Sequence, residues 1–202
     1  MKKKIFGITL AVCLIVLSIA STTMAYFTDT DEKTNTFTAG NVDIKLTEDT
    51  TFASGNVYPG KQIGTAAKVA NVGSEAAYVG GIITVNKVLT PDDVKALFGL
   101  TSFKYAVSET TTTVYVVNDT SFTKDDAPIV LYSSINVPKE WDNTKMNSIF
   151  GDPKLKIIVK AYATQTVGFD AGIDTAEEAL AEAFTEWAGY SSLTTPTFTP
   201  TT

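Results

Sequence analysis

The stretch YVGGIITVNKV, residues 78–88, has the pattern of a long β-strand and sets the fold class that the sequence predicts. β-Branched residues favour strands, and they are frequent in this stretch. Gly80 and Gly81 stand in its middle, where glycine indicates a bulge or a point at which another group closely approaches the backbone. The stretch therefore predicts a strand with a special position at its two glycines.

Other segments of the chain carry a similar β signature. Residues 42–46 alternate apolar and polar side chains, which is typical of a half-buried strand. Residues 129–135 and 155–163 are apolar enough for central strands. Turn signals recur every ~8–12 residues, as in sandwiches and jelly rolls. We therefore expect a mainly β fold, a jelly-roll-like antiparallel β-sandwich, with further strands at residues 68–72, 103–107 and 113–117.

Two short helices are predicted, at about residues 91–98 and 176–188. Thr90 is a suitable cap for the first helix, and Pro91 follows at the first helical position. Thr175 begins a capping box for the second helix. The apolar residues of the second helix share one face and are expected to pack on the sandwich: Leu180, Ala183, Phe184 and Trp187.

The N-terminus has the layout of a secretory signal peptide, residues 1–25. Three lysines precede an apolar run, and small residues end in Ala25, which predicts cleavage between Ala25 and Tyr26. The alternative is a membrane anchor, but the run is shorter than the ~20 residues that span a bilayer. We expect a secreted or cell-surface protein with no stable membrane span after cleavage.

The composition excludes several function classes. The chain has no histidine, no arginine, a single cysteine within the predicted signal peptide, and a formal net charge of −6. An acidic chain without arginine is a poor candidate for nucleic-acid binding. Without histidine it cannot build an HExxH zinc site or a Ser-His-Asp triad, so only catalysis by carboxylates alone or by a Ser-Lys pair stays open. The sequence predicts no enzyme and no cofactor.

Three groups of residues were candidates for a site, and each has a simpler explanation. Asp29-Thr30-Asp31 fails as a calcium loop, because Gly40 stands where the bidentate glutamate belongs. The acidic residues 119–126 are expected to form a solvated surface loop. Tyr162 and Phe169 fit a pocket or ordinary packing equally well.

Several blocks of the sequence resemble the TasA/camelysin family. The most specific are residues 25–30 and 35–44, AYFTDT and NTFTAGNVDI. Weaker matches lie at Pro59-Gly60, at residues 69–79 and at residues 158–170. In that family a signal peptidase of the SipW type releases the chain just before such an N-terminal block. The resemblance implies extracellular biofilm-matrix fibres made of jelly-roll subunits.

Assembly in TasA-like fibres is by donor-strand complementation, in which the freed N-terminus of one subunit completes a sheet in the next. On this chain the resemblance implies a donor strand within residues 26–38, followed by a hinge at Ala39 and Gly40 and a jelly-roll domain at 39–190. Residues 191–202 are expected to be a Thr/Ser/Pro-rich tail without core-forming residues. The donor candidates are Tyr26, Phe27, Thr28, Thr30, Thr34, Thr36 and Phe37.

The partners expected are copies of the same chain, a SipW-type signal peptidase and an accessory fibre protein. Three alternatives stay open. The N-terminal segment could be an unstructured leader, since chain termini are often disordered. The chain could be a camelysin-like surface metalloendopeptidase, although it lacks histidine. It could also be an accessory, anchor or spore-coat protein.

Overall fold

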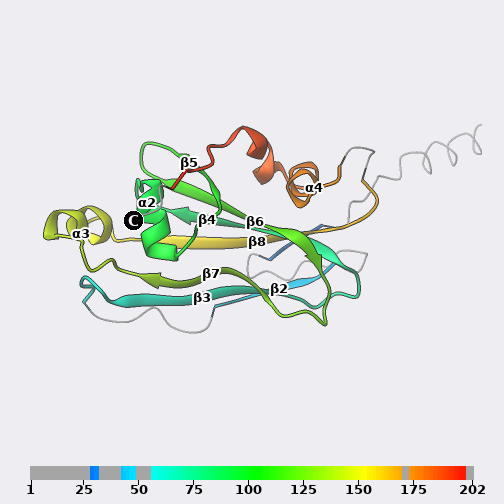
Figure 1. Ribbon diagram of the computed structural model, residues 1–202, viewed down its shortest axis with the longest axis horizontal. Coiled ribbons are helices and arrows are strands. Elements are labelled where there is room, and N and C mark those ends of the chain that lie inside the picture. The colour runs from blue at the N-terminus through cyan, green and yellow to red at the C-terminus, as the bar shows by residue number, and fades with distance from the viewer. Residues whose placement is uncertain (1–27, 32–41, 49–55, 170–172, 199–202) are drawn as a thin grey trace, which may run out of the picture.

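Gly80 and Gly81 lie in β4 (Ala77–Val85), the central strand of a five-stranded antiparallel sheet, here called sheet A. The computed structural model describes residues 28–31, 42–48, 56–169 and 173–198. Sheet A has the order β1-β8-β4-β6-β5, and sheet B has the order β2-β3-β7 (Figure 1). The other strands are β1 (Thr28–Asp31), β2 (Ile44–Glu48), β3 (Gln62–Asn71), β5 (Lys104–Val107), β6 (Thr112–Phe122), β7 (Ile129–Asn136) and β8 (Ile157–Gln165).

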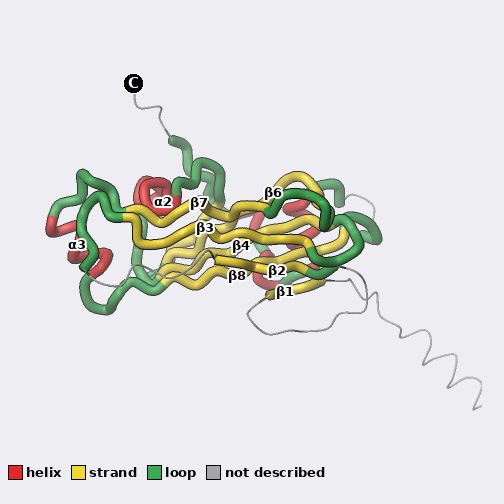
Figure 2. The backbone as a smooth tube through the Cα atoms, turned by 90° about the horizontal axis from the view of Figure 1, so that it is seen from below, coloured by secondary structure: helices red, strands yellow, loops and turns green. Residues whose placement is uncertain are grey.

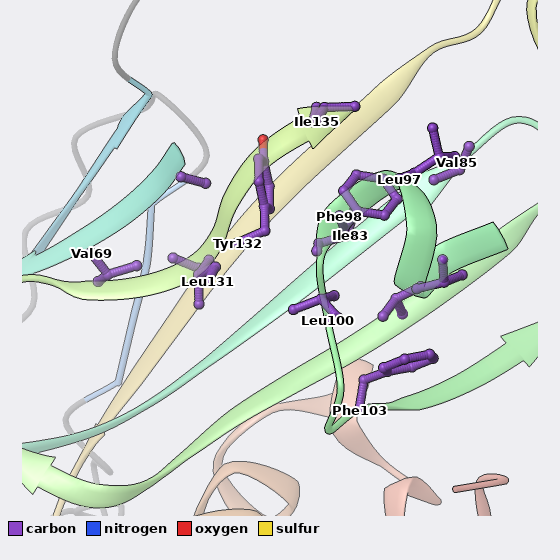
Figure 3. Packing of buried hydrophobic residues seen from close by; sticks show 14 of the residues in the cluster. Val69, Ile83, Val85, Leu97, Phe98, Leu100, Phe103, Leu131, Tyr132 and Ile135 are labelled. Atoms are coloured by element: carbon purple, nitrogen blue, oxygen red, sulfur yellow. The ribbon is translucent and has the colours of Figure 1, made fainter. Parts of the chain in front are cut away.

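The two sheets pack face to face and enclose the main hydrophobic core, which confirms the predicted β-sandwich. Inward-facing side chains from both sheets meet there, together with those of helix α2 (Pro91–Phe98) at one end of the sandwich. The rings of Phe98 and Tyr132 meet edge to face, with their centroids 5.5 Å apart. Figure 3 shows Val69, Ile83, Val85, Leu97, Phe98, Leu100, Phe103, Leu131, Tyr132 and Ile135 in this core.

The helices begin where local capping signals predict them. Thr90 caps α2 in a full capping box, and Gly99 ends it in the left-handed conformation at φ 69°. A second capping box, at Thr175, starts α4 (Ala176–Ala183). This helix ends earlier than predicted, and the chain continues as two 3₁₀ turns, η1 (Thr185–Trp187) and η2 (Tyr190–Ser192). Helix α3 (Asn143–Phe150) was not predicted.

Helix α4 and the two 3₁₀ turns cover the outer face of sheet A and form a third layer (Figure 1). A second hydrophobic cluster fills the space beneath them, centred on the fully buried Trp187 and Tyr162. A Cβ atom at Gly80 would lie 2.5 Å from the Trp187 ring, on this side of the sheet. At Gly81 it would lie 2.7 Å from Leu131, on the side of the main core. The predicted close approach at the two glycines is therefore confirmed, one on each face.

A polar contact ties this third layer to the far edge of sheet A. The Tyr190 hydroxyl donates to Glu177 at 3.3 Å, and Lys104 on β5 donates to the other oxygen of the same carboxylate at 3.4 Å. The Lys104 ammonium also lies 4.1 Å from the centre of the Tyr190 ring. Burial, and then the charge of Glu177, raises the pKa of Tyr190 above its ordinary value.

Two further expectations differ from the structure. The acidic stretch 119–126 is not only a surface loop, because β6 extends to Phe122 and the turn follows it. The predicted tail also contributes to the core, since Phe198 is half-buried against Phe103. Both errors arose from composition: polar residues dominate these stretches, but single phenylalanines anchor them.

We expect Gly80→Ala to lower the free energy of unfolding by about 1–3 kcal/mol, because the added methyl group overlaps the Trp187 ring. Urea denaturation measures this loss. Trp187→Phe shortens the ring, so the double variant Gly80→Ala/Trp187→Phe should lose less than the sum of the two single variants. Additive losses would contradict a direct contact at this position.

We expect the free energy of unfolding to fall as the pH rises above about 10, because Tyr190 stays protonated when folded but ionises when unfolded. The contribution is complete below the ordinary pKa and is lost as the pH rises through the raised folded pKa. Urea denaturation between pH 8 and 11 should give a shallower decline for Tyr190→Phe, by up to about 1.4 kcal/mol per pH unit. Parallel declines in the two proteins would refute this assignment.

Candidate functional site

β1 is an edge strand of sheet A and derives from the segment directly behind the predicted cleavage site. It pairs antiparallel with β8, with Thr28 opposite Thr164 and Asp31 opposite Ala161. It also contacts β2 of sheet B, so it lies where the open sides of the two sheets meet (Figure 2). The N-terminal segment is thus bound to the body of the protein through strand pairing.

β1 covers only part of the edge that β8 presents. β4 pairs with β8 along its whole length, whereas β1 pairs with residues 161–164 alone. In the described parts of the chain, no strand pairs with the outer edge of residues 157–160. An edge of this kind carries main-chain donors and acceptors that can template another strand.

The side chains of β8 differ between its two faces. Ala161 and Ala163 are fully buried and face the core between the sheets. Tyr162 faces the other way, with its ring centroid 5.0 Å from that of Phe184 and 5.9 Å from that of Trp187.

Thr164 is fully buried beside β1, and no described group hydrogen-bonds to its Oγ1. The indole nitrogen of Trp187 is also buried without a hydrogen bond among the described residues. A buried hydroxyl without a partner costs about 1–3 kcal/mol. Thr164 stands opposite Thr28, so this polar group lies at the contact with the N-terminal strand.

The structure places two of the predicted donor residues, Thr28 and Thr30, in β1 opposite Thr164 and Tyr162. The other donor candidates, the predicted cleavage site and the hinge lie outside the described residues: Ala25, Tyr26, Phe27, Thr34, Thr36, Phe37, Ala39 and Gly40. The sequence predicted a strand in this segment but not that it pairs with β8. The only local signal for β8 was its apolar pattern, which does not show which of its sides is covered.

The chain contains a Ser-x-x-Lys spacing that sequence analysis did not single out, at Ser121 and Lys124, and both residues are exposed. Tyr162 belongs to the second hydrophobic cluster, as ordinary packing predicts. In the described segments, no helix is long and apolar enough to cross a membrane.

The residues present do not fit a metal centre. The whole sequence lacks histidine, and its single cysteine, Cys13, lies in the predicted signal peptide. Across residues 28–31, 42–48, 56–169 and 173–198, no three carboxylate or cysteine side chains converge as a metal-binding group. A catalytic zinc site usually needs two or three imidazoles, or cysteine with histidine. The side chains available to bind a metal therefore offer no zinc site of a known peptidase type.

Comparison with known proteins gives one match. Residues 1–95 match the family described as Camelysin metallo-endopeptidase. The matched part runs from the predicted signal peptide through β4 into α2, and β8 lies beyond it. No curated protein and no solved structure matches the chain. The resemblance predicted from the N-terminal block is thus confirmed, in that residues 1–95 are similar to the camelysin family.

Proposed function

We propose that this protein is a secreted structural subunit of extracellular biofilm-matrix fibres, polymerising by donor-strand complementation through its mature N-terminus. The observation that carries the proposal is the pairing of β1 with β8. The strand nearest the N-terminus forms the edge of sheet A and is joined to the next strand only through residues 32–43. Such a strand can leave its own sheet and occupy the same position in a second copy.

When β1 pairs with β8 of its own chain, the subunit is here called the closed chain. Exchange of β1 between two copies would preserve the contacts that β1 makes in the closed chain. Thr28–Asp31 of one subunit would pair with residues 161–164 of the next, in the register already present. The contact is head-to-tail, because donor and acceptor are different surfaces of the chain. A head-to-tail contact that does not close on itself produces a filament.

The half of β8 that no described strand covers gives an exchanged strand further main-chain groups to bind. If the register continues, residues 32–35 of the donor would lie opposite residues 157–160 of the acceptor. Glu32 would then stand opposite Lys160, an attractive pairing of charges across the strands.

The remaining parts of the proposal concern location and partners. The signal peptide would be removed by a SipW-type peptidase, and the mature chain would act at the cell surface or in the matrix. Its main partners would be copies of itself, with an accessory fibre protein as a further partner. Until cleavage, a donor strand joined to the signal peptide would be held back from assembly.

Metallo-endopeptidase activity is the second candidate function, and the description of the matched family favours it. We propose that this chain does not have that activity. The support is the set of side chains that could bind a metal. The sequence contains no histidine, and the described residues contain no cluster of three metal-binding side chains. If the chain were instead a fibre-associated accessory or spore-coat protein, its β8 edge would pair with a strand from a different protein.

We expect strand exchange to join single-cysteine chains through a disulfide. The mature chain would contain no cysteine, so Thr28→Cys and Thr164→Cys can be placed on separate chains. Opposed residues of antiparallel strands are about 4.5–5.5 Å apart between Cα atoms, within the range of a disulfide. Mixing the two chains under oxidising conditions should give covalent heterodimers, seen by mass spectrometry, within filaments seen by electron microscopy.

The matched control pairs Thr28→Cys with Ser108→Cys, which lies in the exposed β5–β6 turn and should not cross-link. A chain starting at Thr38 should form no filaments. The proposal is overturned if the two cysteines join only when both are on one chain, or if the shortened chain assembles as well as the mature one.

We expect purified mature protein to leave casein intact, with and without a metal chelator, because no side-chain set in the described residues can hold a catalytic zinc. Gel electrophoresis after long incubation measures this. Thermolysin under the same conditions provides the positive control. Casein cleavage that a chelator abolishes would establish the peptidase function instead.

A further inference from the structure

The opposite edge of sheet A is closed by the other end of the chain. β5 pairs with β6 on its inner side, with Lys104 opposite Tyr115 and Val107 opposite Thr112. On its outer side the Tyr105 amide donates to the carbonyl of Thr194 at 3.1 Å, in an antiparallel bridge. Residues 193–198, here called the C-terminal strap, follow this edge toward α2 (Figure 1).

Side chains anchor the strap at both ends. Leu193 packs against the second hydrophobic cluster, under the third layer. Phe198 packs against the main core, with its ring centroid 5.8 Å from that of Phe103. The Lys95 ammonium lies 4.6 Å from the centre of the Phe198 ring, within the range of a cation–π interaction. These contacts join elements far apart in the sequence and hold the strap across β5.

The strap is itself a poor template for another strand. Pro196 stands in its middle and has no N–H to offer to a neighbour. Only one main-chain bridge joins the strap to a strand in the described residues. Proline and irregular backbone are the devices by which natural sheets block pairing at an exposed edge.

β5 lacks other protection at this edge. Its one charged residue, Lys104, is engaged with Glu177 and Tyr190 of the third layer. Val107 at its end is 46% exposed. Without the strap, β5 would present an apolar strand with an open row of main-chain groups, which favours pairing between copies.

We propose that the C-terminal strap closes the β5 edge in cis and excludes strand pairing between copies there. Sheet A then has one edge that accepts a strand and one that does not. This function of the strap does not require that β1 be exchanged, since it concerns the far edge. If the donor-strand mechanism is also correct, the strap restricts growth to one direction and suppresses lateral bundling.

The test uses the mature chain carrying Thr28→Cys and Thr164→Cys together, with the disulfide formed within each chain. This disulfide holds β1 on β8, so any association reports on other surfaces. A version ending at Ser192 lacks the strap, and a version ending at Phe198 is the matched control. We expect the control to be monomeric by light scattering and the strapless version to form dimers or larger species.

Two further measurements test the proposal in case the chain without the strap folds poorly. In the full mature chain without the cysteines, Phe198→Ala should speed hydrogen exchange at the Tyr105 amide about fivefold or more, as expected when one main-chain hydrogen bond is weakened. A synthetic peptide of residues 193–202 should return the strapless chain to monomers. The same peptide with Phe198→Ala should not.

The proposal is overturned if the strapless chain folds and stays monomeric. It is equally overturned if Phe198→Ala leaves the exchange rate of the Tyr105 amide unchanged. Association of the strapless chain together with faster exchange at Tyr105 supports it, whether or not unlocked chains form filaments. The strap and the donor-strand mechanism are therefore tested separately.

Discussion

The hydrogen-bonding groups at the edges of sheet A are the constraint on which the rest of the structure depends. An antiparallel sheet that does not close into a barrel leaves two outer strands with unpaired main-chain groups. In this protein the chain covers part of one edge with β1, close to its N-terminus, and crosses the other with the C-terminal strap. The covers differ: the first is a regular strand that extends the ladder, and the second is an irregular segment held by side chains.

The interior of sheet A provides a firm base for these two covers. β4 is central, and both of its glycines are needed because a hydrophobic cluster touches the backbone from each side. β8 is paired with β4 along its full length, so the edge strand stays in place whether or not β1 is bound. This division between a fixed body and a peripheral strand suits the proposed fibre subunit.

Local signals predicted the features that depend on neighbouring residues. The caps at Thr90 and Thr175 and the close approach at Gly80-Gly81 have causes within a few residues, and the structure confirms them. Helix α3 was missed because it is only eight residues long and mostly polar, although Asp142 caps it and its apolar residues, Met146, Ile149 and Phe150, recur at helical spacing. The β8 edge could not be predicted, since pairing joins residues more than a hundred positions apart. Phe198 was missed because the composition of its surroundings is that of a disordered tail.

The link between β1 and the body of the protein has a consequence for the kinetics of assembly. A strand tethered through residues 32–43 meets its own sheet at an effective concentration on the order of millimolar. In the proposed mechanism, a second copy in dilute solution would therefore compete poorly for the same edge, and the closed chain would act as a stored form of the subunit. Growth would then require a threshold concentration and would begin after a lag set by release of β1. Export that concentrates newly cleaved chains at the cell surface would bring them above this threshold.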